Sequence, residues 1–338
     1  MRSKINIALL GCGRISKKHI KAIADNIDYY KLVAVCDINI DKAKDLADQF
    51  RVITKNQNEI KLYNDYESML QNEIIDLVSI LTPSGHHFEH SMTAIKYSKN
   101  VLVEKPMAMS VKEADLMINY AKNSGVSIGV CYQKRFNNAI VMLKKALENK
   151  DLGKIFVVNA QTHWCRTPEY YKQSNWRGTR KMDGGTLMNQ SIHIIDIVLW
   201  LLGLEIVSID SLIKNFNHPI NEVEDYAVAR IKFSDDVIAN IESTVNIYEG
   251  DYAENIIVIA EKGFVHIGGK AINQVLEWRT EKSEKHLNEE IADIYGNGHS
   301  SLYKDYAIKK EFKINGVEGR KALSVIEDIY SKGYHGGE

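Results

Sequence analysis

The sequence predicts an α/β protein of two domains, in which a doubly wound parallel sheet is followed by an α+β domain with an open, largely antiparallel sheet. The chain has 338 residues, which is long for a single domain. Its first part alternates short apolar runs with helical segments, whereas its later runs alternate at period two. We therefore predict one domain over residues 1–130 and a second over residues 131–338.

The composition is that of a soluble globular protein. Hydrophobic residues make up 45% of the chain, charged residues 26%, and the formal net charge is −1. Nucleic acids and anionic membranes are therefore not expected partners, and an anionic substrate would require a local cluster of cations.

The cysteines and the N-terminus indicate a cytoplasmic protein. Cys12, Cys36, Cys131 and Cys165 lie far apart and form no C-x-x-C pair, so we predict reduced thiols and no zinc site. The apolar run that ends at Cys12 is too short for a membrane span and lacks a cleavage signal.

The first strand predicts a dinucleotide site. An apolar run over residues 5–10 ends in Gly11-Cys12-Gly13-Arg14-Ile15-Ser16, and a second run ends at Asp37. In a Rossmann domain the glycines allow a tight turn and close approach of the pyrophosphate, and the acid binds the ribose hydroxyls. Asp37 would repel a 2′-phosphate, so NAD is favoured over NADP.

Two further strand ends carry polar residues. The run over residues 76–81 stops at Thr82-Pro83, and Val101-Leu102-Val103 stops at Glu104-Lys105-Pro106. Ligands of doubly wound sheets bind at the carboxyl ends of strands, so chemistry is expected here. Ser110 and Glu113 predict a capping box for a helix ending at Gly125.

The second domain is expected to hold an antiparallel sheet with helices on one face. Asp235-Asp236 separates two alternating runs and predicts a hairpin turn. A last helix over about residues 320–331 has one apolar stripe, which indicates that it docks. That stripe consists of Ala322, Val325, Ile326 and Ile329.

A helix that begins near Gly185 has two predicted faces. Ile192, Ile195, Leu199 and Leu202 are expected in the core, and a polar stripe carries Asn189, His193, Asp196 and Trp200. Such a stripe suggests a wet cleft. The alternative is a structural histidine bonded to Asp196.

Cations and aromatic rings alternate between Trp164 and Lys181. Guanidinium groups bind phosphate in two-point contacts, and aromatic rings stack on a base. The segment is therefore a candidate substrate loop, and the alternative is a solvated, charged surface loop. Its members are Trp164, Arg166, Tyr170, Tyr171, Lys172, Trp176, Arg177, Arg180 and Lys181.

Several of these segments together resemble the glucose–fructose oxidoreductase / inositol dehydrogenase / MocA family. They are the glycine turn with His19, Thr82 to His87, Glu104-Lys105-Pro106, residues 184–196, and Glu222 to Asp225. The resemblance implies that Lys105 and His193 bracket a reacting hydroxyl, with either of them as the base. It also implies cofactor binding by Gly11, Gly13, Arg14, Ile15, Asp37, Thr82, Pro83, His87 and Glu104.

Asn189 and Ser191 stand where many inositol dehydrogenases have an aspartate and a glycine. The segment from Met188 to His193 instead resembles the UDP-N-acetylglucosamine and UDP-N-acetylglucosaminuronate 3-dehydrogenases. This branch implies oxidation at C3 of a nucleotide sugar for polysaccharide biosynthesis, 2-oxoglutarate as a hydride acceptor, and a homodimer or homotetramer. Alternatives are a dehydrogenase of free sugars or polyols, an NAD-dependent glycosidase, and a non-catalytic NAD-binding regulator. The predicted substrate-binding residues are Lys105, Arg135, Trp164, Arg166, Tyr171, Trp176, Arg177, Asn189, Gln190 and His193.

No metal site is predicted. His86, His87 and His90 have the spacing of helical metal ligands, but no carboxylate or cysteine set accompanies them.

Overall fold

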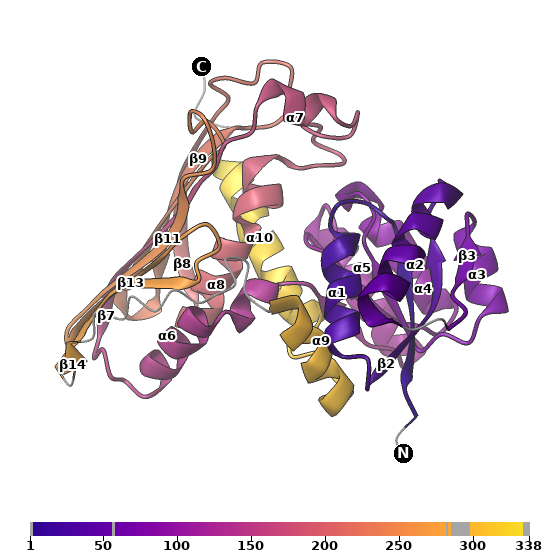
Figure 1. The fold of residues 1–338 in the computed structure, drawn as a ribbon. Coiled ribbons are helices and arrows are strands. Elements are labelled where there is room, and N and C mark those ends of the chain that lie inside the picture. Colours follow the sequence, from indigo (N-terminus) through magenta and orange to yellow (C-terminus); the bar gives the residue numbers. More distant parts are fainter. Residues whose placement is uncertain (1–2, 56–57, 282, 285–297, 334–338) are drawn as a thin grey trace. The chain divides into compact units, whose positions relative to one another are not determined.

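The computed structural model describes residues 3–55, 58–281, 283–284 and 298–333 (Figure 1). The chain forms two compact units. One contains Met1–Gln133 and His299–Arg320, and the other contains Lys134–Gly298 and Lys321–Glu338. The return of the chain to the first unit at His299 had no signal in the sequence, because the helix involved carries no glycine turn or strand-end motif.

The first unit holds a six-stranded sheet in the order β3-β2-β1-β4-β5-β6, and every neighbouring pair is parallel. This order confirms the predicted doubly wound, Rossmann-type sheet. The strands are β1 (Ile5–Leu10), β2 (Tyr30–Cys36), β3 (Lys61–Tyr63), β4 (Leu77–Ile80), β5 (Asn100–Val103) and β6 (Ile128–Val130).

Helices connect these strands, and the pairs α1/α2 and α4/α5 pack side by side (Figure 1). Ser110 caps α5 by accepting the Glu113 N–H, and the helix ends at left-handed Gly125, as predicted. The helices of this unit are α1 (Ser16–Asp25), α2 (Ile40–Thr54), α3 (Tyr66–Asn72), α4 (His87–Lys96), α5 (Val111–Ser124) and α9 (Gly298–Lys309).

The second unit holds an eight-stranded sheet in the order β14-β13-β12-β11-β7-β10-β9-β8. All neighbouring pairs are antiparallel except β7 and β10, which confirms the predicted largely antiparallel sheet. The strands are β7 (Ile155–His163), β8 (Ile206–Lys214), β9 (Tyr226–Phe233), β10 (Ile238–Thr244), β11 (Ala253–Ala260), β12 (Gly263–Gly268), β13 (Gln274–Thr280) and β14 (Ser283–Glu284).

Burial alternates along β9 and β10, so one face of this sheet packs on a core. Helices α6 (Asn138–Glu148) and α8 (Ile192–Leu202) cover that face (Figure 1). Asp235 and Asp236 both have positive φ in the turn between β9 and β10, which confirms the predicted hairpin.

The last helix, α10, spans Gly316–Gly333 and so begins before the predicted start near residue 320. Its predicted apolar stripe is buried as expected, at Ala322, Val325, Ile326 and Ile329. Across the described residues, no helix combines the length and the apolar character that crossing a bilayer demands.

Candidate active site

The glycine turn after β1 fits a dinucleotide. Gly11 has a φ of +96°, and a Cβ there would lie 2.9 Å from the Leu81 carbonyl carbon, so only glycine is tolerated. A Cβ at Gly13 would meet no described atom within 4 Å, which leaves its backbone open to a ligand. Ser16, in place of a third glycine, is buried and donates its hydroxyl to the Gly13 carbonyl at 2.6 Å.

Asp37 lies directly beside this turn. Its Oδ2 accepts the Cys12 N–H at 2.7 Å, and its Oδ1 accepts the Asn39 N–H at 2.9 Å. These bonds hold the carboxylate at the end of β2, where it can accept hydrogen bonds from the ribose hydroxyls. Arg14 is exposed and Ile15 half-buried at the start of α1. The residues present therefore fit NAD.

His87 joins the loops that follow β4 and β5. Its Nδ1 lies 2.6 Å from the Pro106 carbonyl oxygen and its Nε2 lies 2.8 Å from the Thr82 carbonyl oxygen. The ring is buried, and burial lowers the pKa of His87. His87 therefore lies between the loop at Thr82 and the loop at Pro106 and contacts a carbonyl oxygen of each.

A buried hydrogen-bond network lies behind Lys105. Glu104 Oε1 accepts from His19 Nε2 at 3.0 Å, and His19 Nδ1 contacts the Tyr303 hydroxyl at 2.7 Å. Burial opposes ionisation of Glu104, but the hydrogen bond from His19 and the proximity of His299, whose Nε2 lies 3.6 Å from Oε1, prevail and hold the pKa of Glu104 well below the ordinary value. An anionic Glu104 is thereby placed next to Lys105, which is half-buried at the end of β5.

The network also has the composition of a metal site. Ligand atoms of His19, Glu104, Cys131 and His299 all lie within 4.8 Å of one another. The sequence prediction considered only His86, His87 and His90. We interpret the cluster as a hydrogen-bond network, because His19 and Glu104 bond to each other and burial raises the pKa of the Cys131 thiol well above normal.

In the second unit, His193 follows a π-helical turn. Residues Leu187–Ser191 form this turn, and α8 continues directly from it, with His193 as its second residue and 4% exposed. Such π-turns recur at functional sites. The turn carries Asn189 and the buried Gln190, so both are held on the backbone that leads to His193.

The predicted faces of this helix are only partly correct. Ile192 and Ile195 are buried, but Leu199 and Leu202, in the last turn of α8, are half-buried. Asp196 is bonded to Arg135 through its two oxygens, at 2.6 and 2.7 Å, so the polar stripe is not a wet cleft at this point.

Arg135 was predicted to bind substrate, and its position argues for a structural role. Its side chain is 4% exposed, and its guanidinium group lies 5.4 Å from the Trp200 ring centroid as well as on Asp196. Tyr171, also predicted to bind substrate, is buried, with its ring centroid 4.9 Å from that of His218.

Four predicted substrate-binding residues, Trp164, Arg166, Trp176 and Arg177, alternate in space with the ring of Tyr170 as a ladder of rings and guanidinium groups. Arg166 lies 4.7 Å from the Trp164 centroid and 5.0 Å from that of Tyr170. Arg177 lies 4.2 Å from the Tyr170 centroid and 4.5 Å from that of Trp176. We call Trp164, Arg166, Tyr170, Trp176 and Arg177 the cation–aromatic ladder. All five side chains are half-buried, unlike those of a solvated loop.

Three buried charged residues near these elements were missed by sequence analysis. Lys134 pairs with Glu254 and lies 5.3 Å from the Trp164 centroid. Asp183 accepts the Gly178 N–H at 2.7 Å and also a bond from the Asn189 amide nitrogen, which orients Asn189. Glu224 accepts the Leu187 N–H at 2.9 Å. Only Glu224 had a signal, as part of the Glu222–Asp225 motif.

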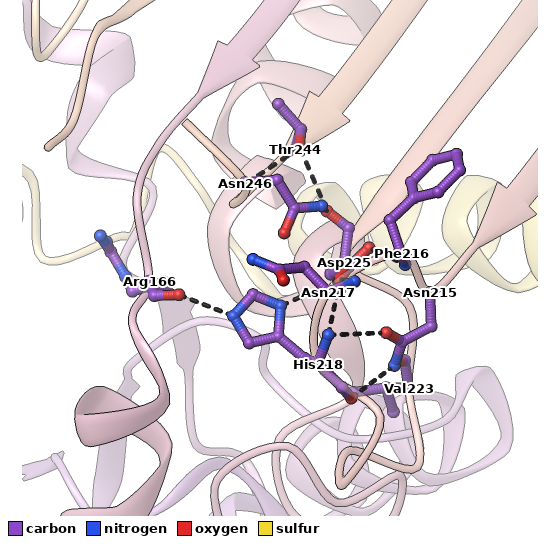
Figure 2. Close-up of polar contacts among 9 residues, drawn as sticks. All are labelled: Arg166, Asn215, Phe216, Asn217, His218, Val223, Asp225, Thr244 and Asn246. Carbon is purple, nitrogen blue, oxygen red and sulfur yellow. Dashed lines mark hydrogen bonds and ion pairs between the residues drawn. The ribbon is translucent and has the colours of Figure 1, made fainter. Parts of the chain in front are cut away.

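Figure 2 shows how His218 ties the start of the ladder to a neighbouring loop. Its Nδ1 bonds Asp225 at 2.9 Å, and its Nε2 lies 2.7 Å from the Arg166 carbonyl oxygen. Both ring nitrogens face acceptors, so the imidazolium satisfies both contacts. Burial opposes this charge, but the Asp225 and Arg166 bonds outweigh it and raise the pKa of His218.

We expect the stability of the protein to fall as pH rises through the folded-state pKa of His218. A raised folded-state pKa contributes stability that is complete below the unfolded value of about 6.5 and is lost above it. The His218→Gln variant should lack this component, so the difference in melting temperature between wild type and variant should shrink from about pH 6 to about pH 9. A constant difference would contradict the assignment.

Fold and site define an oxidoreductase with an NAD-binding Rossmann domain. The model of the oxidoreductase family with an NAD-binding Rossmann fold matches residues 5–132, and that of the GFO/IDH/MocA C-terminal domain matches residues 140–266. The chain therefore belongs to the Gfo/Idh/MocA family of oxidoreductases, with an NAD-binding Rossmann domain.

Relatives and solved structures extend this likeness over most of the chain. The scyllo-inositol 2-dehydrogenase (NAD(+)) of Bacillus subtilis is 28% identical over 79% of this chain and 75% of its own length. Oxidoreductase P35 of Formosa agariphila is 28% identical over 60% of this chain, and the match spans 62% of that protein, less than two thirds.

Two crystal structures of WlbA dehydrogenases, both in complex with NADH and UDP-GlcNAcA, are each 29% identical to this chain and cover 99% of it. The Bordetella pertussis structure has a TM-score of 0.85 with 98% of its chain covered. The Chromobacterium violaceum structure has a TM-score of 0.88 with 96% covered.

Proposed function

We propose that the protein oxidises the C3 hydroxyl of a UDP-N-acetylhexosamine or its uronate. The cation–aromatic ladder carries this proposal. Two arginines interleaved with three rings supply phosphate binding and base stacking in a chain whose net charge is only −1. A nucleotide diphosphate needs both, whereas a neutral polyol needs neither. The likeness to the WlbA structures with bound UDP-GlcNAcA supports the same substrate class.

The proposed chemistry assigns a task to each of four motif side chains. Lys105 and His193 serve the reacting hydroxyl: one accepts its proton and the other donates a hydrogen bond to its oxygen. NAD, when bound, accepts the hydride from the sugar carbon. Asn189, oriented by Asp183, offers an uncharged contact to a hydroxyl or acetamido group. Glu104 accepts the Lys105 backbone N–H at 3.2 Å, which helps to fix the backbone that carries Lys105.

A second candidate is oxidation of a free polyol such as an inositol. The similarity to the Bacillus subtilis scyllo-inositol 2-dehydrogenase favours it. The ladder argues against it through Arg177, which is held against the Tyr170 and Trp176 rings and would have no phosphate to bind. Arg166 is already paired with Asp251 at 2.8 Å. Asn189 also stands where many inositol dehydrogenases carry an aspartate, as noted from the sequence.

The test is mass spectrometry of UDP-N-acetylglucosamine and its uronate after incubation with the protein, NAD and 2-oxoglutarate. Loss of two hydrogen atoms from one sugar, with formation of 2-hydroxyglutarate, is expected. Lys105→Met serves as the matched control and should leave both sugars intact. Unchanged nucleotide sugars together with oxidation of an inositol would overturn the proposal in favour of the second candidate.

A further inference from the structure

A buried carboxyl group lies beneath the turn that leads to His193. Glu224 is 3% exposed, and its Oε1 accepts the Leu187 N–H at 2.9 Å, at the start of the π-helical turn. Gly185 has a φ of +83°, and a Cβ there would overlap Glu224 Oε2. The Gly184-Gly185 turn is therefore closed directly over the Glu224 side chain.

The hydrogen bonds around Tyr330 on α10 indicate which form Glu224 takes. The Tyr330 hydroxyl contacts the Gly184 carbonyl oxygen and lies 3.0 Å from Glu224 Oε1. A hydroxyl has one proton, and a carbonyl oxygen can only accept. Both contacts are hydrogen bonds when Tyr330 donates to Gly184 and a protonated Glu224 donates to Tyr330.

The second carboxyl oxygen of Glu224 also indicates the protonated form. Glu224 Oε2 is buried and has no hydrogen-bond partner among the described residues. A charged oxygen in that position would be neither hydrated nor bonded, which is costly. Consistent with this, burial raises the pKa of Glu224 to about 7, against the opposing bond from the Leu187 N–H.

Few charges face this carboxyl group. Arg180 is the cation whose charge favours ionisation of Glu224, but its guanidinium group bonds the Glu222 carbonyl oxygen at 3.1 Å. Asp225, the next residue, is bonded to His218 instead. On the β10 side, Thr186 bonds Ser243, a neutral hydroxyl, at 3.0 Å.

We infer that Glu224 is a positioning residue, which in its neutral form holds the turn from Gly184 to Ser191 and thereby places Asn189 and His193. Ionisation removes the proton that bonds Tyr330 and leaves a charged oxygen under Gly185, so the turn loosens as pH rises. The role toward His193 rests on the proposed function, because His193 acts only if the reaction is as proposed. The effect of Glu224 ionisation on the Gly184–Ser191 turn does not depend on the proposed function.

The first test is thermal and needs no substrate. A group with a raised folded-state pKa contributes stability that is lost as pH rises through that value, and Glu224→Gln lacks this loss. The melting temperature of Glu224→Gln minus that of wild type should therefore increase from about pH 5.5 to about pH 8. Glu222→Gln, an exposed neighbour, is the matched control and should show no such increase. A pH-independent difference for Glu224→Gln would overturn the inference.

The second test measures turnover with whichever sugar the protein oxidises. The ratio of kcat for Glu224→Gln to kcat for wild type should rise with pH. The rise is up to about tenfold from pH 7 to pH 8 if only the enzyme with a neutral Glu224 turns over. The KM for NAD should not follow this trend, because the cofactor residues belong to the first unit. Parallel pH profiles would overturn the positioning role even where the thermal result holds. If no sugar is oxidised, the proposed function fails while the thermal test still decides the charge coupling.

Discussion

Replacement of Lys105 with methionine, or of His193 with asparagine, is expected to lower kcat by about 10²–10⁴-fold, because in the proposed function each change removes a group that accepts the hydroxyl proton or donates a hydrogen bond to the reacting oxygen. Methionine retains the length of the lysine side chain, and asparagine retains polarity at the start of α8, so the fold should persist. Turnover is measured under saturating NAD with the sugar that the mass-spectrometric test shows to be oxidised.

The affinity for NAD separates this role from a structural one. The dissociation constant for NAD should change less than about threefold in both variants, because Gly11, Gly13 and Asp37 are untouched. Lys112→Met removes an exposed lysine of the same unit and should leave both quantities at wild-type values. A loss of NAD binding as large as the loss of turnover would contradict the catalytic assignment.

Replacement of Arg135 with alanine should lower the free energy of unfolding by about 3–5 kcal/mol, because it leaves the Asp196 carboxylate buried without its partner. The Asp196 side chain is 1% exposed, so water cannot replace the two lost bonds. Urea denaturation followed by circular dichroism measures the change. For comparison, Arg51→Ala breaks an exposed pair with Asp48 and should cost less than about 1 kcal/mol.

The double variant Arg135→Met/Asp196→Leu tests whether the unpaired Asp196 charge causes the loss of stability in Arg135→Ala. It removes both charges and keeps apolar volume, so most of the lost stability should return. A double variant as unstable as Arg135→Ala would show that packing against Trp200, rather than the uncompensated charge, dominates. An Arg135→Ala variant of wild-type stability with impaired turnover would restore the original prediction of substrate binding.

Features that depend on neighbours in the sequence were predictable. The glycine turn, Asp37 at the end of β2 and the strand ends at Thr82 and Lys105 follow from local spacing, because parallel strands place their carboxyl ends at one edge. The hairpin at Asp235 and the cap at Ser110 likewise depend on a few consecutive residues.

Side-chain pairs between residues far apart in the sequence were not predictable. Arg135 and Asp196 are 61 residues apart, and His19 and Tyr303 are 284 apart, so no spacing rule joins them. The π-turn before α8 also escaped prediction, because side-chain periodicity does not distinguish one π-helical turn from the α-helix that follows it. The predicted core stripe was only partly correct, because Leu199 and Leu202 in the last turn of α8 are half-buried.

By itself, the sequence determined the fold class, the preference for NAD and the segments that carry lysine, histidine and the cation–aromatic ladder, since periodicity, glycine turns and residue chemistry are local properties. Only the tertiary structure decided which charges are paired and which groups are neutral. Burial and hydrogen-bond partners set those states, and both arise from contacts between residues far apart in the chain, as Glu224 beneath Gly185 and beside Tyr330 shows.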